Sequence, residues 1–298
     1  MWTTVRVPAS SANLGPGFDA LGLALKIYLI CRFRPSRQLQ IRVTGRDAQS
    51  IPQDETNLIW RTACQVAGDV DAPLPAIELE IQNQIPLGRG LGSSAAALTA
   101  GVVMANQLLA LGWKRARILD EAAKIEGHPD NVAACVLGSL VASGIDSGGV
   151  ARAVRVDLSP QYRVAVVAPD YPLATTTARS VLPDCYSRED AIFNLQRSAM
   201  LMAALATGTT SAFPTALEDR LHQPYRARLI PGLEQVLRLR APGLLGCALS
   251  GAGPSILVFY EQGFAEVCDL VRQIFRHHGS EAEIMDQGVD TEGFQILE

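Results

Sequence analysis

Alternating apolar and polar residues mark the β-strands that the chain is expected to form. Residues 77–82, Ile-Glu-Leu-Glu-Ile-Gln, repeat with a period of two, which is typical of an antiparallel strand with one face in water. Other apolar, β-rich runs predict strands at residues 1–9, 21–34, 39–46, 139–145, 151–158, 162–168, 246–249 and 255–260, with one more near the end of the chain. Polar loops are expected at 10–19 and 169–179.

A different pattern predicts the helices. Residues 94–111 are mostly small and apolar, which predicts a helix buried on nearly all sides, with Gly112 just past its end. A helix at 129–138 would begin with Pro129 and place His128 at its cap. Residues 54–59 are predicted to be the polar start of a helix that runs to about Gly68. Further helices are predicted at about 114–125, 188–207, 213–221, 231–240 and 264–277. The chain is expected to change domain near Asp157, giving domains at residues 1–157 and 158–298.

The densest motif is a glycine-rich stretch that leads into the buried helix. The N–H groups of such a loop and of the next helix's first turn would converge on one point, where the helix dipole also favours an anion. Phosphate is the expected ligand. The residues are Pro86, Leu87, Gly88, Arg89, Gly90, Leu91, Gly92, Ser93, Ser94, Ala95 and Ala96.

Other interpretations of this stretch remain open. A tight turn into a buried helix would need no ligand. Residues 90–95 also fit the dinucleotide fingerprint G-x-G-x-x-A, but the strand before them alternates, and no acid follows until Asp120. The motif lacks the Lys-Ser/Thr ending of the common P-loop, so amides, a metal ion and, as one candidate, Arg89 would meet the phosphate charge.

Polar and glycine residues elsewhere are further candidates for a site. Asn13 and Asp19 stand in the expected loop at 10–19, where each could also be an ordinary turn residue. Asn57 stands near a helix start, where its amide would cap the helix or pair with a nucleobase edge. Gly251 and Gly253 would form either a hairpin turn or part of a site.

Four chemically useful side chains fall within residues 126–131. Glu126, His128, Asp130 and Asn131 would lie at a helix start, where acidic residues also complement the helix dipole. That role explains neither His128 nor Asn131, so the cluster is a candidate functional site. Zinc is disfavoured because no second His or Cys stands at ligand spacing.

Composition narrows the function classes. The 298 residues are 48% hydrophobic and carry a net charge of -4, which suits one large or two ordinary domains and disfavours binding to nucleic acid or anionic membranes. Arginine supplies 23 of the 26 basic residues, since the lysines are Lys26, Lys114 and Lys124, and arginine is the better bidentate partner of carboxylates and phosphates. Six isolated cysteines and the lack of a signal or membrane segment predict a cytoplasmic protein with buried, reduced thiols.

Three stretches together resemble the motifs of the GHMP small-molecule kinases. They are residues 8–19, PASSANLGPGFD, residues 86–96, PLGRGLGSSAA, and residues 250–255, SGAGPS. The Asn-Leu-Gly-Pro-Gly-Phe-Asp form and the run at 128–133, HPDNVA, are most similar to the homoserine kinase family within that superfamily. The resemblance covers nearly the whole chain. It implies a two-domain α+β fold, with an N-terminal domain like the second domain of ribosomal protein S5, a ferredoxin-like C-terminal domain and a site between them.

The resemblance also implies ATP-dependent phosphorylation of the side-chain hydroxyl of L-homoserine, on the route to threonine. Phosphoryl transfer depends mainly on positioning and on neutralisation of the phosphates. In the family pattern, the amides of residues 90–94 hold the phosphates, and Ser93 holds Mg²⁺ with an acid from the following helix. Glu126 is the candidate acid. Asp120 and Glu121 stay open, because one residue separates Glu126 from His128 where many relatives have several.

Homoserine offers a carboxylate, an ammonium group and a hydroxyl, and the family uses arginine forks for the carboxylate. The matching positions are Thr175, Arg179 and Arg226 for the carboxylate, Asn13 and Asp19 for the ammonium group, and His128 and Asn131 for the reacting hydroxyl.

The catalytic role of Asp130 is a separate question. Other GHMP kinases place an aspartate near the hydroxyl, but a carboxylate beside a metal ion and phosphates is a poor base at neutral pH, so orientation by Asn131 is expected instead. Two alternatives stay open: a GHMP kinase for another alcohol such as mevalonate or a sugar, and a nucleotide-binding protein without turnover. A homodimer is one further expectation.

Overall fold

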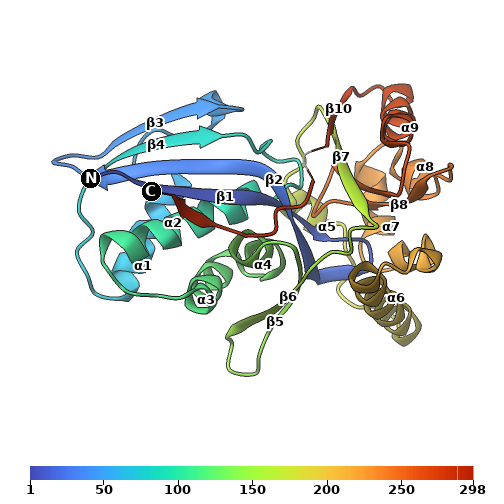
Figure 1. Cartoon of the computed structure of the whole chain (residues 1–298), viewed down its shortest axis with the longest axis horizontal. Helices are drawn as coiled ribbons and strands as arrows, with labels where there is room; N and C mark the ends of the chain where they lie inside the picture. Colours follow the sequence, from blue (N-terminus) through green and yellow to red (C-terminus); the bar gives the residue numbers. More distant parts are fainter. Residues whose placement is uncertain (287, 298) are drawn as a thin grey trace.

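A seven-stranded sheet forms the first half of the molecule in the computed structural model, which describes residues 1–286 and 288–297 (Figure 1). Its strands follow the order β11-β1-β2-β4-β3, with β5 beside β2 and β6 beside β5. All pairs are antiparallel except β3 with β4. The strands are β1 (Thr3–Asn13), β2 (Gly17–Pro35), β3 (Gln40–Gly45), β4 (Ile77–Asn83), β5 (Leu140–Ile145), β6 (Ala151–Val156) and β11 (Gln295–Leu297).

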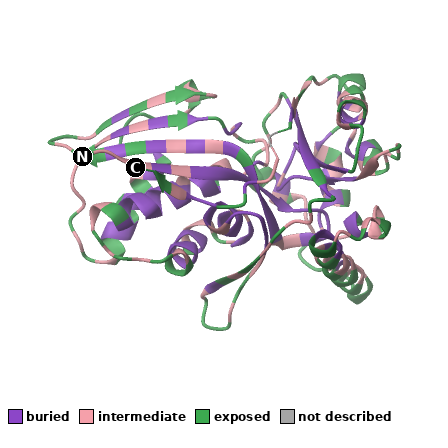
Figure 2. Ribbon diagram, in the orientation of Figure 1, coloured by how far each residue is buried: buried purple, intermediate pink, exposed green. Residues whose placement is uncertain are grey.

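Four helices cover one face of this sheet and leave the other face to solvent (Figure 1). They are α1 (Leu58–Asp69), α2 (Ser93–Leu108), α3 (Arg115–Glu126) and α4 (Asp130–Leu137). Strand β4 alternates between buried and more exposed residues, as predicted, because one face meets the helices (Figure 2). Helix α2 is buried along most of its length, which its small apolar residues allow.

The second sheet is antiparallel and has the order β10-β7-β9-β8. Numbered by chain position, its strands run 4-1-3-2 with helices between the first and second and between the third and fourth, which is the ferredoxin-like arrangement. The strands are β7 (Arg163–Pro169), β8 (Leu244–Leu249), β9 (Ile256–Tyr260) and β10 (Ala282–Met285). The helices of this half are α5 (Thr175–Ser180), α6 (Arg188–Thr207), α7 (Gln223–Arg226), α8 (Leu233–Leu237) and α9 (Phe264–His277).

The expected loop at 10–19 is wrong, because the first two strands continue through most of it. Ser10 pairs with Ala24 and Ser11 with Leu23, so just a short turn at residues 14–16 separates β1 from β2. Both serines are fully buried, and their hydroxyls hydrogen-bond Asn131 and Ser250. The polar composition of this stretch predicts a loop, but the serines can be buried in strands because their hydroxyls are hydrogen-bonded.

Several predictions in the second half also need correction. The predicted helix at 213–221 is replaced by short 3-10 turns, Thr210–Ala212 and Thr215–Leu217, because Phe213 precedes a proline and is extended. The helix predicted at 231–240 begins at Leu233, after Gly232 takes a left-handed φ of 88°. Part of the expected loop at 169–179 forms helix α5, whose Ala178 is buried.

Smaller differences concern helix ends, the last strand and the cysteines. Helix α2 ends at Leu108, so Gly112 lies beyond its C′ position, and α4 has Pro129 rather than His128 as its N-cap. The last strand, β11, pairs with β1 in the first sheet rather than extending the second. The six cysteines are free, as predicted, but Cys64 and Cys185 are exposed. The division of the chain at Asp157 remains a prediction.

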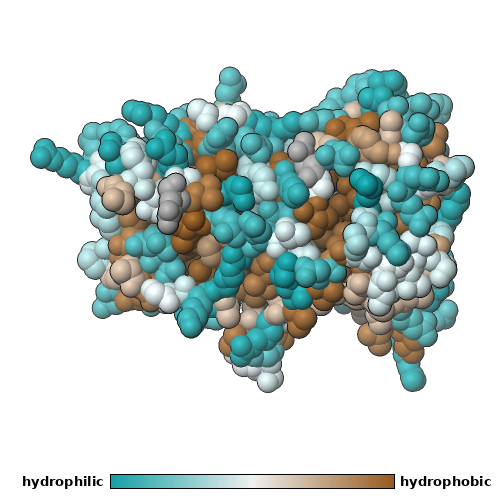
Figure 3. All heavy atoms as spheres, in the orientation of Figure 1, coloured by the Kyte–Doolittle hydropathy of each residue, from teal (hydrophilic) through white to brown (hydrophobic). Residues whose placement is uncertain are grey.

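The surface combines hydrophilic and hydrophobic side chains, which are interspersed on the face that Figure 3 shows. Among the described helices, none combines the length and hydrophobicity that a bilayer crossing requires.

Candidate active site

The three motifs noted in the sequence meet at one pocket between the two sheets. Strand β1, the start of β2, the glycine loop, α2, α4, α5, α7 and the turn after β8 all contribute to it. The lining residues are Asn13, Asp19, Gly88, Gly90, Leu91, Gly92, Ser93, Ser94, Glu126, His128, Asp130, Asn131, Leu173, Thr175, Arg179, Arg226, Gly251 and Ala252.

The glycine loop takes a conformation that an anion site requires. Gly88, Gly90 and Gly92 have φ values of 65°, 73° and 67°, in the left-handed region that favours glycine. Gly92 is the N-cap of α2 and has no side chain to cap it, so the first N–H groups of the helix face the pocket unpaired by a cap. Together with the helix dipole, these N–H groups form a seat for a phosphate.

The third motif holds the glycine loop against the first motif. The Ser250 hydroxyl donates to the Gly90 carbonyl at 2.7 Å, and the Gly251 N–H donates to the Ala12 carbonyl at 3.0 Å. The Asn13 amide donates to the Gly251 carbonyl at 2.9 Å. Gly251 therefore belongs to the site. Gly253 has a packing role instead, because a Cβ at this position would clash with the side chains of Ile230 and Leu249.

Glu126 lies at the mouth of the glycine loop. Its carboxylate accepts a hydrogen bond from the Ser94 hydroxyl at 3.1 Å, and no cation pairs with it among the described residues. Burial raises the pKa of Glu126, with smaller opposing effects from His128 and the Ser94 hydroxyl. A partly buried, unpaired carboxylate beside a phosphate seat is a suitable ligand for a divalent cation.

The two alternative acids lie outside the pocket. Glu121 pairs with Arg117 at 2.6 Å, and Asp120 pairs with Lys124 at 2.9 Å and accepts the N–H of Ala151 at 3.1 Å. Both carboxylates are therefore already engaged, and neither lines the pocket.

The cluster at 128–131 is tied to the first motif. His128 Nδ1 lies 2.6 Å from Asp130 Oδ1, and this hydrogen bond is the main reason that the pKa of His128 is raised. Asn131 Oδ1 accepts the Ser10 hydroxyl at 2.8 Å, which orients the amide. Its Nδ2 lies 3.5 Å from Asp130 Oδ1 and keeps a second hydrogen for the pocket. Asp19, His128 and Asp130 bring their ligand atoms within 4.8 Å of one another.

Two arginines from the second half of the chain complete the pocket. Arg179 forms a bidentate pair with Asp19 at 2.8 and 3.1 Å, although the two are 160 residues apart. Arg226 is 1% exposed and pairs with no carboxylate among the described residues. Burial, and then the charge of Arg179, lower the pKa of Arg226 to about 10. The Phe18 ring lies near both arginines, 5.6 Å from Arg179 Cζ and 5.4 Å from Arg226 Cζ.

Other predicted residues lie elsewhere. Asn57 caps α1 through the N–H of Ile59 at 3.0 Å and donates to the Pro52 carbonyl at 2.7 Å, so its amide is fully engaged. Pro86, Ala95 and Ala96 are buried, and Arg89 lies outside the lining of the pocket. Asn57 and Leu87 line a separate apolar pocket beside Ser93 and Ser94, with Leu29, Ile59, Ile81 and Ala97.

Comparison with known proteins identifies the family. The models for the GHMP kinases N terminal domain and the GHMP kinases C terminal domain match residues 57–139 and 201–274. A curated homoserine kinase of Solibacter usitatus is 64% identical over 295 residues, 99% of this chain and 97% of that protein. The chain belongs to the homoserine kinase family of the GHMP kinases.

Solved structures of GHMP kinases agree with this assignment. The crystal structure of homoserine kinase from Cytophaga hutchinsonii is 28% identical, covers 99% of this chain and 97% of that one, and has a TM-score of 0.84. Lactococcus lactis galactokinase complexed with galactose has a TM-score of 0.69 at 15% identity, a likeness of fold alone. The two-domain GHMP kinase fold predicted from the sequence is confirmed.

Three residues that join the parts of this GHMP kinase site were missed in the sequence. Ser10 and Ser250 stand inside the quoted motifs and link them through their hydroxyls. His222, one helical turn before Arg226, contacts its guanidinium group at 3.0 Å. The i, i+4 spacing of His222 and Arg226 is a signal that they share a helix face, but it does not say which face meets the pocket.

Proposed function

We propose that this protein is an ATP-dependent kinase that phosphorylates the side-chain hydroxyl of L-homoserine, with Mg²⁺ as cofactor. The observation that carries the proposal is the buried Arg226, which lines the same pocket as the glycine loop. Its guanidinium group donates to two backbone carbonyls and to His222 but has no carboxylate partner among the described residues. A buried charge without a counter-ion is costly unless a ligand pairs with it. The names of the related proteins support the same substrate.

The amino-acid head group of the substrate would lie between the two arginines and Asp19. The charge of Arg179 lowers the pKa of Arg226, and both Cζ atoms lie near the Phe18 ring, so a carboxylate that reached both guanidinium groups would gain two forks. The ammonium group would take Asp19, replacing part of its present pair with Arg179. Asn13 holds the Asp19 backbone N–H at 3.0 Å and so fixes its position. Thr175 lines the same side of the pocket.

ATP would bind with its phosphates on the N–H groups of the glycine loop and of the first turn of α2. Ser93 and Glu126 would hold Mg²⁺, and Ser94, which contacts Glu126, would orient that carboxylate. When bound, the ion neutralises phosphate charge and polarises the transferred group. The adenine ring would occupy the apolar pocket beside the loop, with Asn57 shaping its wall rather than pairing with the base.

The acceptor hydroxyl would be aligned rather than deprotonated by a dedicated base. Asn131 Nδ2 would hold it, since Ser10 occupies the amide oxygen. Asp130 already accepts from His128 and from the Asn131 N–H at 2.7 Å, so its carboxylate organises the cluster. Phosphoryl transfer through a loose transition state gains more from alignment than from early proton removal.

A substrate panel tests the proposal. ADP release by the purified protein would be measured with homoserine, mevalonate, galactose and serine, each with and without Mg²⁺. We expect stimulation by homoserine, and by serine far less. Stimulation by mevalonate or galactose instead would assign another GHMP kinase activity, and ATP binding without turnover would indicate a regulatory protein. The proposal places the enzyme in the cytoplasm, and a homodimer stays a prediction for sedimentation analysis.

A further inference from the structure

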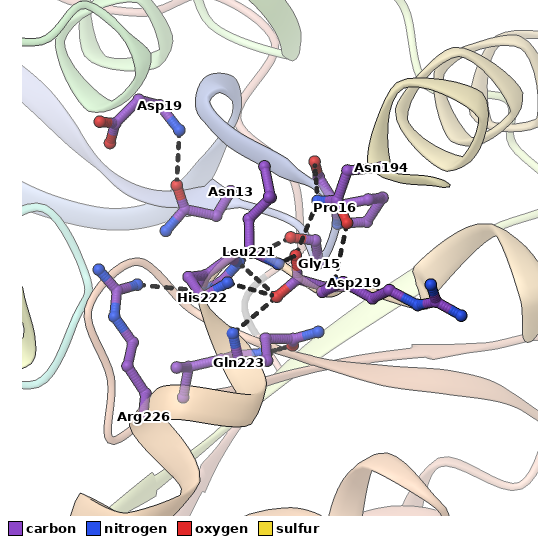
Figure 4. Close-up of polar contacts among 12 residues, drawn as sticks. Asn13, Gly15, Pro16, Asp19, Asn194, Asp219, Leu221, His222, Gln223 and Arg226 are labelled. Carbon is purple, nitrogen blue, oxygen red and sulfur yellow. Dashed lines mark hydrogen bonds and ion pairs between the residues drawn. The ribbon is translucent and has the colours of Figure 1, made fainter. Parts of the chain in front are cut away.

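His222 is buried between the two halves of the head-group site and is used by neither the phosphate seat nor the metal site. It is fully buried, and Figure 4 shows it between Arg226 and the turn that joins β1 to β2. One ring nitrogen, Nδ1, lies 3.0 Å from Arg226 Nη1, and the other, Nε2, lies 2.7 Å from the Gly15 carbonyl oxygen.

These partners determine the protonation of the ring. A guanidinium group has donors and no acceptor, so Nδ1 must accept from Arg226. Nε2 then carries the hydrogen and donates to the Gly15 carbonyl, which makes His222 neutral with one tautomer selected by its neighbours. The Phe18 ring stacks on the imidazole with a centroid distance of 5.3 Å and prevents it from turning.

A buried carboxylate fixes the segment that carries His222. Asp219 accepts the backbone N–H groups of Leu221, His222 and Gln223 at 2.8, 3.0 and 2.6 Å, and so holds the start of α7. It also accepts the Asn194 side-chain amide at 2.7 Å, and the same amide donates to the Pro16 carbonyl at 3.0 Å (Figure 4).

The β1–β2 turn is therefore held at two successive carbonyls by side chains from the second half of the chain. Gly15 has a φ of 88°, and a Cβ on it would lie 2.7 Å from the Leu217 carbonyl oxygen, so the turn approaches that half closely. Asn13 and Asp19 flank this turn and face the pocket. Arg226 also donates to the Gly251 and Ala178 carbonyls at 3.0 and 3.2 Å, and the imidazole of His222 adds a direct link from its guanidinium group to this turn.

We propose that His222 is a positioning residue that sets the spacing between Arg226 and the β1–β2 turn, and thereby the specificity for an α-amino-acid head group. This inference rests on the proposed function. A carboxylate and an ammonium group on one carbon can contact Arg226 and Asp19 at the same time only if these two side chains are a particular distance apart. A displacement of about 1 Å is enough to lose much of the benefit of this double contact. The neutral ring is suited to this role because it accepts from one side and donates to the other.

Protonation of the ring would abolish this arrangement. A proton on Nδ1 would remove one acceptor of Arg226 and place two cations in contact. Burial lowers the pKa of His222, Arg226 lowers it further, and Asp219 and Asp19 oppose this. The ring is therefore neutral at and above the ordinary histidine pKa of about 6.5, and the folded protein loses the spacing when the pH falls through the lowered pKa of His222.

Two variants separate the two hydrogen bonds. Asn at this position places an amide oxygen near that of Nδ1, so His222→Asn can still accept from Arg226 but does not reach Gly15. Gln extends to the position of Nε2, so His222→Gln can still donate to Gly15. Each variant is compared with wild type for KM of homoserine, KM of ATP, kcat and melting temperature.

We expect the KM for homoserine to rise about 10- to 100-fold in His222→Gln, which loses one acceptor of a buried charge, and less in His222→Asn. The KM for ATP should change less than threefold in both. In wild type, kcat/KM for homoserine should fall as the pH is lowered through the pKa of His222, which lies below the ordinary histidine value, while the KM for ATP stays constant, and His222→Asn should lack this limb.

Other outcomes would overturn the inference. Equal rises in both KM values, or a lower melting temperature with an unchanged KM for homoserine, would make His222 a purely structural residue. The tautomer of His222 in the wild-type protein needs no variant to fold and decides the question alone if both variants aggregate: a protonated ring, or a hydrogen on Nδ1, in the nitrogen NMR spectrum at pH 7 would contradict the proposed role. Lack of homoserine-dependent ADP release by wild type would refute the proposed function itself.

Discussion

Replacing Gly90 with alanine tests whether the glycine loop is held by direct backbone contact with the third motif. Gly90 has a φ of 73°, and an added Cβ would lie 2.2 Å from the Ser250 carbonyl oxygen and 2.8 Å from the Gly253 nitrogen. Both obstacles are backbone atoms, so they cannot rotate away. Gly112 is a matched control, because its φ is 68° and nothing lies within 4 Å of its Cβ position.

The two substitutions share one effect and differ in another. A left-handed conformation costs an L-residue about 1–2 kcal/mol, and both variants should lose that much stability. Gly90→Ala should lose about 1–3 kcal/mol more, because the overlap forces the backbone apart. The expected losses in the free energy of unfolding are therefore about 2–5 kcal/mol for Gly90→Ala and about 1–2 kcal/mol for Gly112→Ala.

Urea-induced unfolding measures these losses, and ADP release measures the effect on function. A shift of about 1 Å in the loop would lower kcat by about 100-fold and raise the KM for ATP, whereas Gly112→Ala should keep wild-type kinetics. Equal destabilisation by the two substitutions, with an unchanged KM for ATP in Gly90→Ala, would refute the contact argument. The loop would then need glycine for its backbone angles and not for the approach to Ser250.

Three further predictions test individual roles. Glu126→Gln should remove most turnover yet raise the melting temperature of the ligand-free protein at pH 7. Burial raises the pKa of Glu126, so the contribution of this side chain to stability is present below the ordinary carboxyl pKa. That contribution is lost as the pH rises through the raised pKa of the folded protein. Glu121→Gln should keep turnover, and the reverse order would move the metal site. Arg179→Ala should weaken the binding of homoserine by about 2 kcal/mol and leave ATP affinity unchanged. This value is at the lower end of the cost of truncating one partner of a charge pair, because the Arg179 side chain is 37% exposed. Asn131→Ala should lower kcat more than Asp130→Asn; a loss of about 10²–10⁴-fold in Asp130→Asn, with an acid limb abolished, would instead reveal a general base.

Local patterns in the sequence predicted the parts of the molecule whose conformation depends on near neighbours. The glycine loop and the start of α2 were predicted because left-handed backbone angles and helix starts are properties of a few consecutive residues. The buried helix α2 and the alternating strand β4 follow from residue size and period.

Resemblance of the three motifs supplied the family, the fold and most of the candidate residues, and the comparisons confirmed the first two. It did not distinguish Glu126 from Glu121 as the acid near the loop. The structure places Glu126 beside Ser94 and Glu121 in an ion pair with Arg117, because these two carboxylates leave α3 on different faces.

Tertiary structure alone decided which distant groups meet. The serines at 10 and 11 have the composition of a loop but are strand residues, since the ladder with β2 and the hydroxyl contacts with Asn131 and Ser250 satisfy them. The pair of Asp19 with Arg179 and the contact of His222 with Gly15 join residues 160 and 207 positions apart. Intrinsic preferences act over a few residues, whereas these contacts depend on how the two sheets pack against each other, which no local pattern in the sequence specifies.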